Sequence, residues 1–392
     1  MEIHSIRQLT EWLDAHRPLA GLRLQDLDLT TLESRFLATD DLFGLVVLGG
    51  KVSPLLLTHL QNQGAVVFPG DPQAPVDVFR ANLYTGHELY RGLDGPGGYA
   101  STPDFRAYRW SRDRRLAGDA YATLLRAIHD DSVTDALDEW VAGRRVVGVM
   151  GGHAIARSTE AYASAARAGY ALAQAGLLVA TGGGPGLMEA ANLGAAAPSV
   201  DALESAVDRL RRVPSFQPDV GAWARLGFEV RDGWGARVTS RPRIPGPVVE
   251  ARAPAAVPQS LGVPTWFYGH EPPNVFAEGV AKYFSNAIRE DGLLARCNAG
   301  VLVLPGSAGT VQEVFQLATR LFYAAHDAVL RPMVLVGVEH WTETLPVWPL
   351  VHALATSPAM ASAVHLVDEV DEAVALLIQS PDGHTAAPSR LT

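Results

Sequence analysis

The segment at residues 305–313 combines the residue types needed to bind a phosphate and to place a carboxylate beside it. Its sequence, PGSAGTVQE, follows a predicted strand at 301–304 and opens a predicted helix running to about residue 323. Glycines let the backbone approach a ligand closely, and the free N–H groups at a helix start favour an anion. We expect phosphate contacts at Gly306, Ser307, Gly309 and Thr310, and a catalytic carboxylate at Glu313. The local alternative is a capping box between Thr310 and Glu313, which would only stabilise the helix start.

A second glycine-rich segment, TGGGPGLME at residues 181–189, lies between a predicted strand at 177–180 and a helix ending near residue 197. A third glycine turn ends the predicted strand at 145–150. Turns at the carboxyl ends of parallel strands can converge on one crevice. Glu189 would contact ribose hydroxyls or simply suit the positive helix end. The expected nucleotide contacts in these two turns are Gly151, Gly152, Gly182, Gly183, Gly184, Gly186, Met188 and Glu189.

Several common site types are excluded by residue usage. Neither loop has the GxxxxGK[ST] pattern of a P-loop, and GxGxxG followed by an acidic residue about twenty positions later is absent. The only lysines are Lys51 and Lys282, neither in a recognisable cofactor motif, which argues against pyridoxal phosphate. Cys297 is the single cysteine, so neither an intramolecular disulfide nor a multi-cysteine metal site can form. We expect no cofactor and no metal.

The second half of the chain alternates β-rich runs with helical patterns, which predicts an α/β fold with a doubly wound parallel sheet of Rossmann type. Further strands are expected at 263–268, 333–338 and 364–367, and helices at about 159–174 and 274–289. A smaller N-terminal α/β domain is predicted at 1–115, with strands at 42–48 and 65–68 and a helix between them. We expect a helical connector at 116–143, the main domain at 144–379, and a flexible tail at 380–392. Residues 198–260 would be an insertion with one amphipathic helix, serving as an elaborated surface, an oligomer contact or a lid over the site.

Composition limits the possible partners. The chain has 392 residues, 48% of them hydrophobic, and a formal net charge of −10. A nucleic-acid binder normally needs a clustered positive surface, so we expect no nucleic-acid partner. No stretch of 18 apolar residues and no signal-peptide pattern is present, so we expect a cytoplasmic protein without a membrane partner.

The ordered pair GGGPGLMEAANLGA and PGSAGTVQE resembles the GGG-x-G-x-ME and PGG-x-GT-x-x-E signatures of the LOG family, often mislabelled lysine decarboxylase. The resemblance covers roughly residues 144–370 and implies a larger bacterial form with an added N-terminal domain. The family includes cytokinin riboside 5′-monophosphate phosphoribohydrolases and nucleosidases that act on nucleoside 5′-monophosphates. Two departures stand out. Ser307 replaces the usual glycine, and Arg289, followed by Glu290, is shifted by one position from the family's catalytic arginine-lysine pair; Arg296 is the rival.

The resemblance implies hydrolysis of the N-glycosidic bond of an AMP-like nucleotide, giving a free base and ribose 5-phosphate. Glu313 would stabilise positive charge on the ribose and orient or deprotonate a water, and Arg289 would hold a substrate oxygen or assist the departing base. His270 and Asn274, in the segment before the Arg289 helix, could contact base or ribose; alternatively His270 shapes a turn and Asn274 caps the helix.

Two other classes of function remain open at this stage. One is a non-catalytic nucleotide or cofactor carrier or sensor of the same fold, and the other is a DNA-processing protein of similar architecture, which the acidic charge disfavours. Related proteins assemble as dimers or larger, so a homo-oligomer is expected. The sequence does not specify the base.

Overall fold

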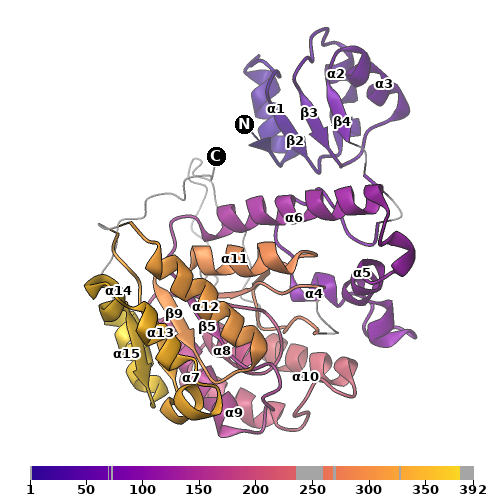
Figure 1. Ribbon diagram of the computed structural model, residues 1–392. Helices are drawn as coiled ribbons and strands as arrows, with labels where there is room; N and C mark the ends of the chain where they lie inside the picture. The colour runs from indigo at the N-terminus through magenta and orange to yellow at the C-terminus, as the bar shows by residue number, and fades with distance from the viewer. Residues whose placement is uncertain are drawn as a thin grey trace. The chain divides into compact units, whose positions relative to one another are not determined.

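The computed structural model describes residues 2–68, 70–71, 74–234, 259–267, 271–325 and 328–379, which form two compact units (Figure 1). Unit 1 comprises Met1–Leu83 and Arg109–Glu139, and unit 2 comprises Tyr84–Tyr108 and Trp140–Thr392. We expected residues 84–108 in the N-terminal domain, but they cluster with unit 2, where Tyr84 and Val280 exchange two backbone hydrogen bonds of 2.9 Å.

Unit 1 is a small α/β unit with a parallel sheet in the order β1-β2-β3-β4. Its apolar core is drawn from the strands and from α1 and α3, which present Leu9, Leu56 and Leu60 to it. The strands are β1 (Glu2–Ile3), β2 (Arg23–Gln25), β3 (Val46–Leu48) and β4 (Val66–Phe68). The helices are α1 (Ile6–Asp14), η1 (Leu29–Leu32), α2 (Glu33–Leu37), α3 (Pro54–Asn62), η3 (Arg114–Leu116) and α6 (Ala120–Val141), whose last two residues belong to unit 2.

Unit 2 contains a seven-stranded parallel sheet in the order β11-β10-β9-β5-β6-β7-β8. The strands are β5 (Val146–Met150), β6 (Leu178–Thr181), β7 (Ser260–Gly262), β8 (Gly279–Val280), β9 (Gly300–Val303), β10 (Met333–Val336) and β11 (Val364–Val367). Strands β5, β6, β9 and β10 are buried along their whole length, as expected for a sheet covered on both faces. The predicted α/β fold, a doubly wound parallel sheet with a smaller N-terminal α/β domain, is therefore confirmed, and the smaller unit has a parallel sheet of its own.

Helices cover both faces of this sheet (Figure 1). α7 (Glu160–Gln174) packs against α8 (Leu187–Ala196) and α15 (Val370–Gln379), and α12 (Ala308–Phe322) packs against α11 (Asn286–Arg296) and α13 (Trp348–Leu354). The sheet order reverses between β5 and β9, so the chain winds outward in opposite directions from that point. The remaining helices are α4 (Gly86–Leu89), η2 (Gly98–Ser101), α5 (Pro103–Ser111), α9 (Val200–Leu210), α10 (Val220–Gly233), η4 (His340–Thr344) and α14 (Pro358–Ala363).

The segment at 263–289 differs from the sequence prediction. The expected strand at 263–268 lies earlier, at β7, because Pro264 cannot donate to a ladder. The expected helix from 274 starts only at Asn286, where Ser285 caps α11 by accepting from Ile288 N. Residues 274–284 instead contain a turn at 275–276 and the short strand β8; Tyr283 N donates to the Pro264 carbonyl, and the Tyr283 carbonyl accepts from Trp266 N.

The insertion at 198–260 contains two helices among its described residues, α9 and α10, where one was expected. Residues 235–258 lie outside the described part of the chain. The tail at 380–392 lies outside it as well, so its expected flexibility stays a prediction.

Helices α7 and α8 approach so closely that two glycines are required between them. A Cβ atom on Gly194 would lie 1.8 Å from the carbonyl oxygen of Ala166, and one on Gly169 would lie 2.2 Å from that of Ala191. Both clashes are with backbone, which cannot rotate away. This contact fixes α8, and thereby the loop that precedes it.

We expect Gly194→Ala to destabilise unit 2 by about 3 kcal/mol, because relief requires the two helices to separate. Gly233→Ala is the matched control: a Cβ there meets only Arg209 Nη1 at 3.8 Å, so it should be neutral or slightly stabilising. Urea unfolding followed by tryptophan fluorescence measures both. Equal stability of the two variants would contradict the close-packing argument.

Candidate nucleotide site

Three glycine turns meet at the switch point of the large sheet. The N–H of Gly152, after β5, donates to the carbonyl of Pro305 after β9 at 3.1 Å. The carbonyl of Gly152 accepts from Leu187 N, the first residue of α8, at 3.1 Å. Gly186 has φ +71°, and a Cβ there would lie 2.4 Å from the Gly152 carbonyl oxygen. Only glycine fits such an approach, so the turn at Gly151-Gly152 joins the other two loops.

The first glycine loop is held by buried amide side chains. Asn274, fully buried, donates from its backbone to the Gly183 carbonyl at 2.8 Å and from Nδ2 to the Gly184 carbonyl at 3.1 Å. Its Nδ2 also donates to Asn192 Oδ1 at 2.9 Å, and Asn192 accepts from the Thr181 hydroxyl at 2.7 Å. Asn274 does not cap a helix, since α11 begins twelve residues later. It positions the loop.

The second loop opens directly into α12. A Cβ atom on Gly306 would lie 2.1 Å from Thr310 Oγ1, so the loop folds back on its own helix and needs glycine there. Ser307 is the N-cap residue, but its side chain makes no capping hydrogen bond. The N–H groups of the first turn have no intrahelical partner. Residues 307–309 are exposed, and a Cβ on Gly309 would meet nothing within 4 Å, so this end of α12 is accessible to an anion.

The Arg289–Glu313 pair links α11, α12 and the first loop. Arg289 Nη1 lies 3.2 Å from Glu313 Oε1, and a Cβ on Gly182 would lie 3.6 Å from the same nitrogen. The two side chains are 9% and 12% exposed. Thr310 is not the N-cap and Glu313 bonds Arg289, so the capping-box alternative is wrong. Arg296, two turns further along α11, donates to its own helix at Gly292.

The environment of Glu313 favours its protonated form. Burial raises the pKa of this carboxyl from 4.5 to about 7, with Arg289 lowering it and the carboxylates of Glu290 and Glu271 raising it. A pKa near the working pH is typical of a residue that exchanges protons in catalysis.

Glu189 is used differently from the expectation. It is 1% exposed and receives Arg157 Nε and Nη2, in an ion pair whose guanidinium stacks over Trp223 at 4.9 Å. Arg157 also donates to the Trp223 carbonyl at 3.2 Å. This carboxylate therefore ties α8 to the helices of the insertion, and we leave it out of the proposed ligand contacts.

The other predicted residues differ in how much the structure says of them. Met188 lies against the first loop, with Sδ 2.7 Å from a Cβ placed on Gly182. His270 lies outside the described residues. Lys282 is buried and pairs with Asp104 at 2.6 Å. Among the described residues, no group of three or more His, Cys, Asp and Glu side chains could hold a metal ion.

Sequence reasoning missed the polar neighbours of Arg289. Asn286 Oδ1 accepts from Arg289 Nε and Nη2 at 3.2 and 2.9 Å, and Glu290 accepts from Nη2 at 3.3 Å. The signal was present as helical spacing, since residues three and four apart share a helix face. Asn286 and Arg289 both lie inside the helix expected at 274–289, but only the arginine was given a role. Glu271, whose Oε2 would lie 3.5 Å from a Cβ on Gly184, was also missed.

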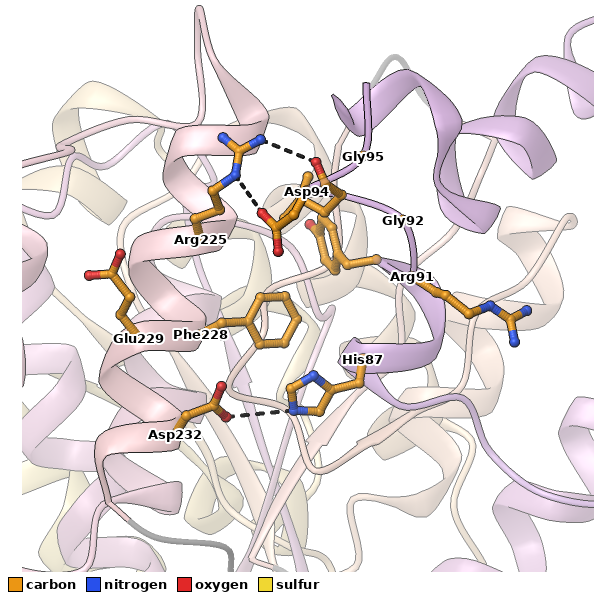
Figure 2. A pocket seen from close by; sticks show the side chains of 11 residues that line it. His87, Arg91, Gly92, Asp94, Gly95, Arg225, Phe228, Glu229 and Asp232 are labelled. Carbon is orange, nitrogen blue, oxygen red and sulfur yellow. Dashed lines mark hydrogen bonds and ion pairs between the residues drawn. The ribbon is translucent and has the colours of Figure 1, made fainter. Parts of the chain in front are cut away.

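A separate cavity of about 500 Å³ lies between α4, the turn after it, and α10 (Figure 2). Two pairs of its charged side chains interact: Arg225 Nε lies 2.9 Å from Asp94, and His87 Nε2 lies 3.6 Å from Asp232. The His87 ring also stacks on Phe228, with centroids 4.7 Å apart. None of its lining residues belongs to the glycine loops, so this cavity is not the predicted nucleotide site.

Comparison with known proteins gives a partial match. Residues 144–200, which include the first glycine loop, match the model of the SLOG cluster4 family. No curated protein sequence matches the chain. A solved structure described as the molybdenum cofactor binding protein from the phototrophic bacterium Rippkaea orientalis aligns with 60% of this chain and 96% of its own, at 14% identity and a TM-score of 0.34. A TM-score this low supports no conclusion about the ligand of this chain. Within the described residues, no helix has the length and apolarity that a membrane crossing requires.

The raised pKa of Glu313 predicts a pH-dependent stability effect. Between pH 4.5 and about 7 the folded protein binds the proton more tightly than the unfolded chain, so this carboxyl lowers stability as pH rises through that window. Glu313→Gln removes the loss. Relative to wild type, the variant should gain stability between pH 4.5 and pH 8, by up to about 3 kcal/mol.

Urea unfolding of both proteins at pH 4.5 and pH 8 measures this change. Glu343→Gln, at an exposed position in η4, serves as the control and should show no such gain. A stability difference between Glu313→Gln and wild type that stays constant with pH would show that Glu313 titrates normally.

Proposed function

We propose that the chain is a LOG-like hydrolase that cleaves the N-glycosidic bond of a nucleoside 5′-monophosphate. The observation that carries this proposal is the position of Arg289 Nη1, between the Glu313 carboxylate of α12 and Gly182 of the first glycine loop. Together with the Gly152 hydrogen bonds, it supports one shared site for the two loops. The partial match to the SLOG cluster4 family includes the first of them.

In this proposal the phosphate lies at the start of α12, against Gly306, Ser307, Gly309 and Thr310. The accessible first turn supports this placement, because its N–H groups lack intrahelical partners and the helix dipole favours an anion there. Glu313 is one turn further along the helix, so a phosphate bound at the end would place the ribose towards the carboxylate. Binding energy at the phosphate would then position the reacting carbon.

Bond cleavage consumes one water. The N-glycosidic bond breaks with its electron pair leaving on the base, which takes up a proton, and the anomeric carbon becomes cationic. The Glu313 carboxylate stabilises that charge and accepts a proton from the attacking water, whose oxygen bonds the anomeric carbon. The products are the free base and ribose 5-phosphate. Arg289 holds Glu313 in place and keeps part of it ionised near neutral pH.

We expect the purified protein to release free base from at least one of AMP, GMP, CMP and UMP, and Glu313→Gln to lose turnover by about 10²–10⁴-fold. Chromatography measures the base, and calorimetry measures binding, which should stay within a few fold in the variant. The parent nucleoside, lacking phosphate, should react poorly. Tight nucleotide binding without base release from wild type would favour the non-catalytic carrier.

The pH profile gives a second check. Glu313 must be ionised to act, and its pKa is raised to about 7, so kcat/KM should be constant above that pH and fall about tenfold per unit below it. An acid limb near pH 4.5 would mean that the group responsible is an ordinary exposed carboxylate.

A further inference from the structure

Glu290 is a buried carboxylate that the proposed reaction does not itself use. It lies on α11 beside Arg289 and is 1% exposed. In the LOG pattern the residue after the arginine is a lysine, whereas here it is Glu290, so the charge beside the arginine is inverted. A buried carboxylate is costly unless its oxygens are paired, so its partners should explain why it is there.

Both oxygens of Glu290 are held. Oε1 accepts from Asn286 Nδ2 at 2.7 Å and from Arg289 Nη2 at 3.3 Å. Oε2 accepts from two amides of the neighbouring helix α12, Gln312 Nε2 and Gln316 Nε2, the latter at 3.3 Å. Glu290 is therefore fixed from α11 on one side and from α12 on the other. Glu313 lies on α12, as do Gln312 and Gln316. The contacts of Glu290 with these two amides therefore fix Glu290 relative to Glu313, the carboxylate that Arg289 faces.

These contacts define which way the guanidinium points. Nε and Nη2 are engaged by Asn286 Oδ1 and Glu290, and Nη1 faces Glu313 at 3.2 Å. Because a guanidinium is planar and its donors are fixed in a fork, holding two of its nitrogens sets the direction of the third. Asn286 Oδ1 contacts both of these nitrogens, and Glu290 Oε1 accepts from Asn286 Nδ2 at 2.7 Å, so Glu290 also fixes the amide that holds the guanidinium.

We propose that Glu290 is the positioning residue of the site, directing Arg289 to Glu313 so that the arginine serves the ribose end and leaves the phosphate to the start of α12. The inference rests on the proposed function and extends it. The start of α12 would bind the phosphate, and Glu313, one turn further along, would face the ribose that becomes positively charged in the reaction.

The charges that face Glu313 are Arg289 and Glu290 from α11, and Glu271 from the segment before β8. The thiol of Cys297, at the end of α11, is neutral because burial raises its pKa to about 12. Arg289 contacts both carboxyl groups, with Nη1 facing Glu313 and Nη2 facing Glu290. Glu290→Gln keeps an oxygen that can accept from Asn286 and Arg289 but removes the negative charge that raises the pKa of Glu313, so that pKa should fall. Gln312→Ala leaves Glu290 less firmly held, so Arg289 is less firmly directed to Glu313 and the pKa of Glu313 should rise.

The test is the pH dependence of kcat/KM in three variants. Glu290→Gln should move the acid limb about one pH unit lower, because it removes a negative charge that raises the pKa of Glu313. Its plateau should fall, with KM changed by no more than a few fold. Gln312→Ala, at an exposed position, should move the limb the other way. Asp291→Asn is the matched control: it removes the same charge one residue along α11, where Asp291 is exposed and pairs with Arg320, and should leave the limb unmoved.

A second readout separates this inference from the nucleosidase proposal. Carboxyl-carbon NMR of the ligand-free protein with ¹³C-labelled glutamate reports the Glu313 titration directly, with Glu313→Gln identifying its resonance. A lower pKa of Glu313 in Glu290→Gln, with an unchanged pKa in Asp291→Asn, supports the inference even if no nucleotide is hydrolysed. An unchanged pKa of Glu313 in Glu290→Gln, or an equal change in both variants, overturns it whatever the activity. If Glu290→Gln fails to fold, Gln312→Ala decides: an upward shift supports the inference and an unchanged titration overturns it.

Discussion

The ion pair between Arg289 and Glu313 is the interaction on which the site depends. It joins α11 to α12, and its arginine nitrogen also approaches the first glycine loop at Gly182. The pair is largely shielded from water, and charges interact more strongly in the protein interior than at its surface. Glu290 and Glu271 add negative charge nearby, which offsets part of the stabilisation that the arginine gives to the Glu313 carboxylate. Together with burial, these charges leave Glu313 with a pKa of about 7, close to neutral pH.

The sheet makes this pairing possible. Strands β5 and β9 are neighbours in space but are separated by about 150 residues in sequence, and the chain winds away from them in opposite directions. In doubly wound sheets, ligands generally bind beside the carboxyl ends of the strands at such a reversal. Backbone contacts hold the glycine turns together at this point, with Gly152 bonded to both neighbours. The rigid frame is made of main chain and buried amides, and the titrating groups project from helices on top of it.

This arrangement sets stability against function. Glu313 is held where ionisation is unfavourable, and a neutral substitute should be more stable at high pH while losing the chemistry. The buried Arg157–Glu189 pair behaves differently, because the two side chains bond each other and Arg157 also donates to the Trp223 carbonyl of the insertion. Two glutamates near the same loops thus have separate roles, decided by what surrounds each carboxylate.

The sequence by itself determined the α/β class, the position of both glycine loops and the helical start at which Glu313 lies. Local chemistry is enough for these, since glycine turns and hydrophobic periodicity depend on near neighbours in the chain. Only the tertiary structure decided that Asn274 fastens a loop, that Glu189 is consumed by Arg157, and that Arg289 rather than Arg296 reaches Glu313. The start of α11 at Asn286 also escaped prediction, because backbone hydrogen bonds to residues 260–266 keep residues 278–283 out of a helix. Partners across a fold are selected by packing between segments far apart in the chain, and no local pattern records that choice.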